Sequence, residues 1–161
     1  MDQTQLWRII EQAKQESQGD GQRQVQLVEE ALQQLSLEEI ETFERIYQAF
    51  HNRSYSKRLW KAIHTFTGFV SDDNFHYFRA WLISRGEGIF CEVMRHPDRV
   101  SEFVDPDGEG EWTLEDLNYA AYKVYEHLTG QNLWEALKTA EPYPLTGYDW
   151  LQPDRIQQGE I

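Results

Sequence analysis

Apolar residues recur at intervals of three and four along almost the whole chain, which is the spacing of one face of an α-helix. No segment shows the sustained alternation of apolar and polar residues that is typical of a half-buried strand. About eight helices are predicted, and the chain is therefore expected to be all-α. They cover approximately residues 4–17, 22–35, 36 to at least 50, 54–66, 72–85, 89–94, 97–104 and 113–128.

Short polar signals mark where several of these helices begin and end. Ser36 stands three residues before Glu39, a spacing at which the two side chains cap the same helix start. Thr113 is predicted to cap the helix over 113–128. Gly68 and Gly130 follow helical segments, and glycine accepts the left-handed backbone that commonly ends a helix.

The segment 72–85 carries apolar residues on nearly every side of its predicted helix. A helix that is apolar almost all round is normally buried inside a domain. We therefore expect this segment to be the interior helix of a compact orthogonal multi-helix bundle. Its large apolar residues are Phe75, Tyr77, Phe78, Trp81, Leu82 and Ile83.

No internal repeat or linker divides the helical part of the chain, so residues 1–140 are predicted to form a single all-helical domain. Residues 141–161 contain several prolines and are predicted to form an extended tail on or near the surface. The aromatic residues expected to fold this tail back onto the domain are Tyr143, Tyr148 and Trp150.

Composition narrows the class of protein. Of the 161 residues, 40% are hydrophobic and 14% aromatic, which is enough for one core. No run approaches the roughly 20 apolar residues that span a bilayer, and the first residues lack the basic and apolar regions of a signal peptide, so a cytoplasmic protein is expected. Cys91 is the single cysteine, which excludes an internal disulfide.

The charge of the chain is negative and unevenly distributed. The formal net charge is −13, which argues against direct binding of nucleic acid or an anionic membrane. Residues 98–116 include eight acids and one base, whereas residues 45–71 include five bases and no acid. Within the basic stretch, Arg53, Lys57 and Lys61 stand at helical spacing. A strongly polarised surface of this kind favours a protein partner or a homodimer, steered by charge.

One cation falls on the predicted buried face. Arg79 lies one helical turn from Phe75 and from Ile83, and a buried cation needs a compensating group. Asp72 and His76 lie on the same side at helical spacing, with Asp73 beside them. These four residues are expected to form either a structural cluster of caps and ion pairs or a polar pocket for a ligand or a reaction.

The residues of this segment resemble a known family. The run Ser71-Asp72-Asp73-Asn74-Phe75-His76-Tyr77-Phe78-Arg79-Ala80-Trp81-Leu82-Ile83-Ser84-Arg85-Gly86 is similar to the signature of the bacterial family catalogued as domain of unknown function 4240. The likeness extends from Leu6-Trp7 to Thr129-Gly130. The resemblance implies a single domain of bacterial type and no particular chemistry.

The stretch 105–116 has the spacing of an EF-hand calcium loop, with acids at the first, third, fifth and twelfth positions and Gly110 at the sixth. A bound Ca²⁺ or Mg²⁺ is a possible cofactor on this pattern. The glutamate at position five, the aspartate at position twelve and the bulky Trp112 depart from it, and an acidic surface turn explains the same residues. The candidate ligands are Asp105, Asp107, Glu109, Glu111 and Asp116, with Thr113 direct or through water.

No catalytic motif stands out, so the sequence leaves open whether the chain is an enzyme and leans towards none. The five histidines lack the spacing of a zinc site, and no nucleophile elbow or phosphate-binding glycine loop occurs. Three functions are expected in order of preference: a non-enzymatic protein-interaction module, a divalent-cation binder through 105–116, and a small-molecule or catalytic pocket around Arg79.

Overall fold

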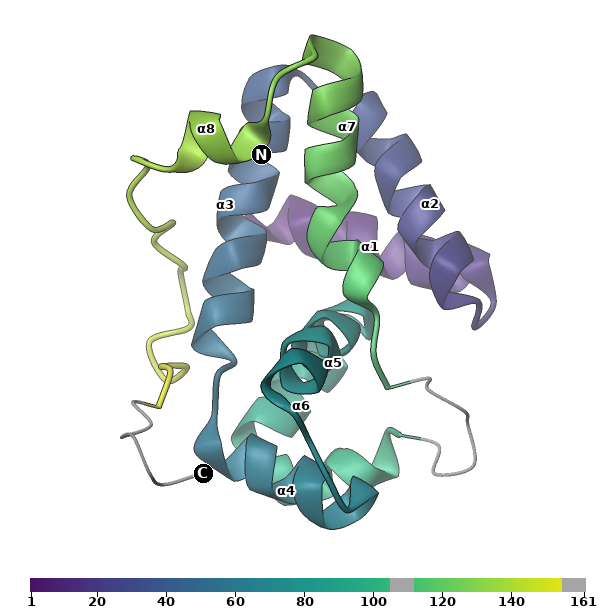
Figure 1. Cartoon of the computed structure of the whole chain (residues 1–161), viewed down its shortest axis with the longest axis vertical. Coiled ribbons are helices and arrows are strands. Elements are labelled where there is room, and N and C mark those ends of the chain that lie inside the picture. The colour runs from purple at the N-terminus through teal and green to yellow at the C-terminus, as the bar shows by residue number, and fades with distance from the viewer. Residues whose placement is uncertain (105–111, 155–161) are drawn as a thin grey trace.

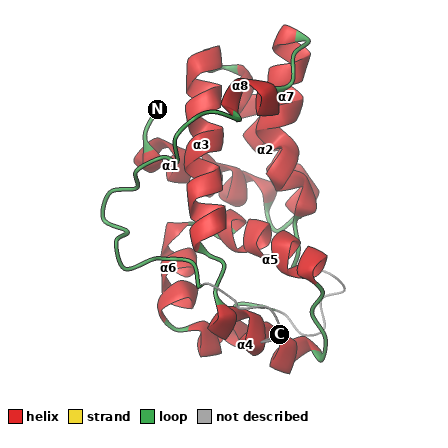
Figure 2. Ribbon diagram, turned by 60° about the vertical axis from the view of Figure 1, so that its left-hand side comes forward, coloured by secondary structure: helices red, strands yellow, loops and turns green. Residues whose placement is uncertain are grey.

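The protein is all-helical in the computed structural model, which describes residues 1–104 and 112–154. No strand occurs in these two ranges, as Figure 2 also shows. The prediction of an all-α fold is confirmed. The α-helices are α1 (Gln3–Ser17), α2 (Gly21–Gln33), α3 (Leu37–Arg53), α4 (Lys57–Thr67), α5 (Asp72–Ser84), α6 (Glu87–Arg95), α7 (Ala120–Thr129) and α8 (Leu133–Leu137), and the 3₁₀ segments are η1 (Pro97–Glu102) and η2 (Glu115–Tyr119).

Several helix ends follow the predicted local signals. The Ser36 hydroxyl accepts a hydrogen bond from the Glu39 amide, and the Glu39 carboxylate accepts one from the Ser36 amide, so the predicted capping box is present. Gly68 ends α4 with φ +84°, and Gly130 ends α7 with φ +71°. Both are in the left-handed region that favours glycine.

Helix α5 is the interior helix of the fold. Every residue from Phe78 to Ser84 is buried, although the first turn of the helix faces solvent. It contacts α1, α3, α6 and η2, which surround it with the large rings of the core. The prediction that this segment lies inside the bundle is confirmed.

The helices cross at steep angles. In Figure 1, α3 runs along the long axis of the molecule, with α7 and α2 in the same upper half, whereas α1 lies across them. Helices α4, α5 and α6 occupy the other half, and Figure 2 shows α5 lying across the lower part of α3. Helix α3 thus connects the two halves and contacts α1, α5, α7 and α8.

Two predicted segments differ from the structure, and one helix of the structure was not predicted. The segment beginning at Pro97 is a 3₁₀ helix rather than an α-helix. The single helix predicted over 113–128 is instead η2 followed by α7, with Leu114 rather than Thr113 at the start of η2. The Leu114 amide donates a hydrogen bond to the Tyr77 carbonyl of α5, 3.1 Å away, so a tertiary contact sets this start. Helix α8 was not predicted, because a single turn carries little periodicity.

The C-terminal segment packs against the core up to Asp154. Leu145, Tyr148 and Leu151 are buried, and the Tyr148 ring lies edge-on to that of Phe50, with 4.8 Å between the centroids. In Figure 1 this segment runs from α8 down the outer side of α3. Residues 141–154 of the predicted extended tail form no helix, and residues 155–161 lie outside the described residues. Tyr148, which was expected on the surface, belongs to the core. None of the helices in the described ranges is both long and apolar enough to cross a membrane.

Candidate functional site

A cavity of about 570 Å³ with a mixed polar and apolar lining lies between α3, α7 and α8. Its volume falls in the range of small-molecule sites in proteins, about 300–1,000 Å³. Each of these three helices contacts the other two. The lining residues of the cavity are Glu44, Tyr47, Gln48, His51, Asn52, His76, Asn118, Tyr119, Tyr122, Glu126, Asn132, Leu133 and Trp134.

Helix α3 supplies the floor of the cavity through its periodicity. Glu44, Gln48 and His51 stand four and three residues apart, so they share one stripe of the helix. The stripe beside it, which includes Phe43 and Phe50, is buried in the apolar core. The helix therefore places hydrogen-bonding groups at the edge of the core rather than in open solvent.

Glu44 is the most unusual residue of the floor. Its side chain is buried, with 3% of the residue exposed, and its Oε1 accepts a hydrogen bond from Gln48 Nε2 at 3.1 Å. Within the described part of the chain, no lysine or arginine opposes its charge. Burial raises the pKa of Glu44 from 4.5 to about 8, and the Gln48 hydrogen bond lowers it only in part. Glu44 is accordingly a neutral carboxylic acid at pH 7.

A hydrogen-bond network joins α3 to α7 and η2 around Glu44. The Tyr47 hydroxyl donates to Asn118 Oδ1 at 2.6 Å, and Gln48 Nε2 also donates to the Tyr122 hydroxyl at 3.1 Å. Asn118 is 8% exposed, and its Nδ2 has no hydrogen-bond partner among the described residues. An unpartnered buried donor costs about 1–3 kcal/mol, so a group that accepts from it would stabilise the site.

Two imidazoles meet at the lower end of the cavity. Since a carbonyl only accepts, His51 Nε2 carries the proton and donates to the His76 carbonyl, 3.0 Å away. The two rings are edge-on at 4.5 Å between centroids. Burial, and then the charge of Arg79, lowers the pKa of His51 from 6.5 to about 3. The same two causes lower the pKa of His76. Both rings are neutral at pH 7.

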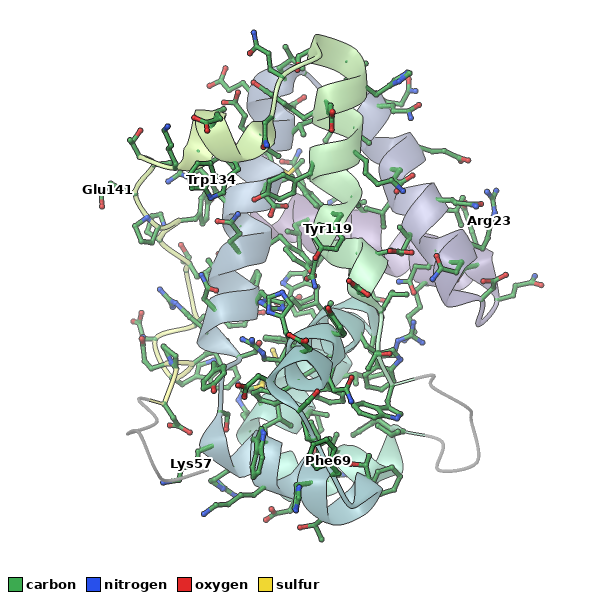
Figure 3. All side chains as sticks on the ribbon, viewed as in Figure 1. Arg23, Lys57, Phe69, Tyr119, Trp134 and Glu141 are labelled. Carbon is green, nitrogen blue, oxygen red and sulfur yellow. The ribbon has the colours of Figure 1, made fainter. Side chains whose placement is uncertain are left out.

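Aromatic side chains form the rim. Trp134 is 54% exposed and Tyr119 is 46% exposed, although both line the cavity. Figure 3 labels both residues, with Trp134 on α8 and Tyr119 where η2 joins α7. Tyr122 also lines the cavity and is partly buried, with its hydroxyl bound to Gln48 of the floor. The rim offers π faces and edges to a ligand, while the floor offers hydrogen-bonding groups.

The residues predicted around Arg79 are only partly brought together. Arg79 is 6% exposed, and its guanidinium donates to the His51 carbonyl at 2.8 Å. It also lies over the rings of Tyr55 and Phe75, 4.9 and 5.1 Å from their centroids. The expected ion pairs with Asp72 and Asp73 are absent from the described structure: both carboxylates are exposed on the first turn of α5.

A backbone carbonyl and two π faces thus hold this cation in place of carboxylates. Of the four predicted residues, His76 lines the cavity directly. Arg79 lies behind it and reaches the site only through His51, and Asp72 and Asp73 are not among its lining residues.

Most of the predicted calcium loop lies outside the residues that the structure describes. Asp105, Asp107, Glu109 and Glu111 lie outside the described residues. Asp116 is exposed in η2. No group of three potential metal ligands occurs in the ranges 1–104 and 112–154. The proposed loop stays a prediction from the sequence.

The two oppositely charged stretches contact each other within the molecule. Arg58 of the basic stretch lies 3.6 Å from Asp98 of the acidic stretch, and both side chains are largely exposed. At the C-terminal segment, Asp154 accepts a hydrogen bond from the Lys57 amide at 2.7 Å. An ion pair on the surface thus joins the basic stretch to the acidic one.

Comparison with known proteins bears on this arrangement. A family model described as "Protein of unknown function (DUF4240)" matches residues 1–127. The chain belongs to this family. The resemblance drawn from 71–86 is confirmed, and the matched range includes every cavity residue of α3, α5, η2 and α7. No curated protein and no solved structure matches the chain.

The DUF4240 match ends before α8, so Asn132, Leu133 and Trp134 complete the cavity from outside the matched range. The floor residues were missed by the sequence reasoning, which followed only the apolar stripe of α3. A signal was present: Glu44, Gln48 and His51 place polar groups at helical spacing directly beside that stripe. What the sequence lacked was any sign that α7 and α8 close over them.

Proposed function

We propose that this DUF4240 protein binds a small organic molecule in the cavity between α3, α7 and α8. The observation that carries this proposal is Glu44, a buried carboxyl on the floor of a cavity of about 570 Å³ without a cationic partner among the described residues. Titratable groups in this state are concentrated at functional sites.

A structural role accounts poorly for Glu44. Burying a carboxyl costs free energy unless its hydrogen-bonding groups are satisfied, and the one described hydrogen bond that Glu44 accepts comes from Gln48. The shift of its pKa corresponds to a penalty of several kcal/mol when the group is ionised. A leucine or methionine at this position would pack without that cost, which supports a role in recognition.

The other polar groups of the cavity support the same proposal. Asn118 of η2 offers an unpartnered amide nitrogen, Tyr122 of α7 a phenol, and His51 of α3 and His76 of α5 neutral rings. Ligand pockets are usually concave sites in which a few polar groups point towards the bound molecule. Because Glu44 is protonated at pH 7, it can donate a proton or a hydrogen bond to a bound molecule.

A protein partner stays a prediction from the charge pattern. Large exposed apolar side chains occur on separate elements of the described structure rather than on one helix face, and two of them, Tyr119 and Trp134, line the cavity. The best supported function is therefore small-molecule binding rather than a broad protein interface.

Chemical-shift mapping of the full-length protein tests this proposal. A fragment set that contains amines, alcohols, amides, carboxylates and phosphates is added to ¹⁵N-labelled protein. The expected result is a saturable shift of the Trp134 indole and of the Gln48 and Asn118 side-chain amides by at least one fragment class. Asn52→Trp, which adds a ring at the mouth of the cavity, should weaken this binding at least about tenfold.

Gln26→Trp on α2 is the matched control, because Gln26 is exposed and does not line the cavity. It should leave fragment binding unchanged. The proposal is wrong if no fragment shifts the cavity signals, or if Asn52→Trp binds the same fragments as well as Gln26→Trp does.

A further inference from the structure

We infer that the cavity selects an organic cation, an amine or a quaternary ammonium group, which sits between the carboxyl groups of the cavity and its aromatic rim. This inference rests on the proposed function, since it names the class of molecule that the same cavity binds. It follows from the charges and the rings of the lining, taken together.

The described residues that line the cavity include two acidic side chains and no lysine or arginine. Glu44 lies on its floor, and Glu126 lies at its edge on α7. A carboxylate or phosphate ligand would therefore find no cation among the described lining residues, since the Lys138 ammonium over the Trp134 ring is paired with Glu135, and it would meet the field of a chain with net charge −13. The Glu126 carboxylate would attract an ammonium group directly. Glu44, which is protonated in the free protein, would lose its proton as the cation binds, because a nearby positive charge favours the ionised carboxylate.

The two histidines of the lining add no positive charge to the cavity. Burial and the charge of Arg79 lower the pKa values of His51 and His76, so both rings are neutral at pH 7. Arg79 is the nearest buried cation, but it is not a lining residue, and its guanidinium is engaged by the His51 carbonyl and by two rings. The remaining groups are amides and phenols, which are uncharged.

The aromatic rim is suited to an ammonium group. Tyr119, Tyr122 and Trp134 are among the lining residues, and rings of this kind attract cations through their π faces, tryptophan most strongly. The Trp134 ring already makes one cation–π contact within the protein, because Lys138 Nζ lies 5.5 Å from the ring centroid. Several aromatic rings around one opening are the arrangement by which proteins bind quaternary ammonium groups.

An organic cation fits better than a metal ion. Although the lining includes two glutamates and two histidines, no three of the described His, Cys, Asp and Glu residues stand close enough to hold a metal. A hard cation such as Ca²⁺ needs six to eight oxygen ligands, which this lining does not bring together. An alkylammonium group needs only one or two carboxyls and a π surface.

Two trios of probes with matched shapes test the inference. The first is benzylamine, benzyl alcohol and benzoate; the second is choline, 3,3-dimethylbutan-1-ol and 3,3-dimethylbutanoate. Each is titrated into the full-length protein, and binding is followed by the Trp134 indole shift and by calorimetry. The cationic member of at least one trio should bind about tenfold more tightly than its neutral analogue, and the anion should bind most weakly.

Glu44→Gln should reduce this preference for the cation to less than about threefold while the neutral analogue keeps its affinity. Glu38→Gln is the matched control, since Glu38 is an exposed residue on the same helix and does not line the cavity. It should leave the preference as in the natural chain.

The outcomes separate the two proposals. Neutral or anionic probes that bind at least as tightly as the cations would overturn the cation preference and leave the small-molecule site standing. A cation preference that survives in Glu44→Gln would also overturn the inference. If none of the six probes nor any fragment shifts the cavity signals, the site itself fails.

Discussion

The buried Glu44 carboxyl should make the stability of this protein fall as pH rises through the neutral range. Its pKa is 4.5 in an unfolded chain and about 8 in the folded protein. Between these two values the folded state binds one proton more than the unfolded state does, so the free energy of unfolding decreases with pH by about 1.4 kcal/mol per unit. Well below pH 4.5 the ionisation of Glu44 does not change the free energy of unfolding, and above pH 8 the decrease in this free energy levels off.

The substitution Glu44→Gln isolates this effect. Glutamine has a similar shape and keeps a hydrogen-bonding carbonyl, but it cannot ionise. From pH 5 to pH 8 the natural chain should lose about 3.5 kcal/mol relative to the variant. The two proteins should therefore have similar stability at pH 5, and the variant should be the more stable one at pH 8.

Urea unfolding at four pH values between 5 and 8, followed by tryptophan fluorescence, measures the difference. Other titrating groups contribute equally to both proteins and cancel in the comparison. Glu38→Gln, an exposed position on the same helix, should give a profile parallel to that of the natural chain. Parallel profiles for Glu44→Gln and the natural chain would refute the reasoning, because they would show that Glu44 titrates alike in the folded and unfolded states.

Three further predictions follow from buried groups. The pKa of His51 falls from 6.5 to about 3 on folding, so from pH 7 to pH 5 the natural chain should lose about 2 kcal/mol relative to His51→Gln in the same urea assay, in which the contribution of Glu44 is common to both proteins. Arg79→Ala should destabilise by about 2–4 kcal/mol, because it removes the contacts with two rings and leaves a buried carbonyl unpaired, whereas Asp72→Ala should cost under about 1 kcal/mol in thermal unfolding. Leu151→Ala should cost about 2–5 kcal/mol if the C-terminal segment is part of the core; a loss below about 0.5 kcal/mol would contradict its burial.

Much of the fold could be predicted because local patterns and the tertiary structure agree. The capping box at Ser36 and the glycine at 68 act through atoms a few residues away, so their geometry does not depend on distant segments. The interior position of 78–84 follows from its composition, since a helix with apolar groups on every side must be covered on every side.

The predictions that failed depend on groups distant in sequence. Arg79 was expected to find a carboxylate on its own helix, but burial placed it against the end of α3, where a carbonyl and two rings satisfy it. The helix start expected at Thr113 is shifted because Leu114 is bound to the Tyr77 carbonyl of α5. Spacing along one helix contains no information about such partners.

Part of the candidate site could be predicted from the sequence. Glu44, Gln48 and His51 lie at helical spacing, so their common direction follows from the sequence alone. Their burial does not, because it depends on α7 packing against α3 and on the single turn of α8, which was not predicted. A glutamate on an exposed stripe is an ordinary surface residue, whereas the same glutamate under two helices is a neutral acid.

The sequence by itself determined most of the helices, several of their ends, the interior segment and the family to which the chain belongs, since all of these are encoded in the order of neighbouring residues. Only the tertiary structure decided which polar groups are removed from water, because desolvation depends on segments brought together from distant parts of the chain. The charge states of Glu44, His51 and His76, and with them the chemistry of the cavity, are set by that packing.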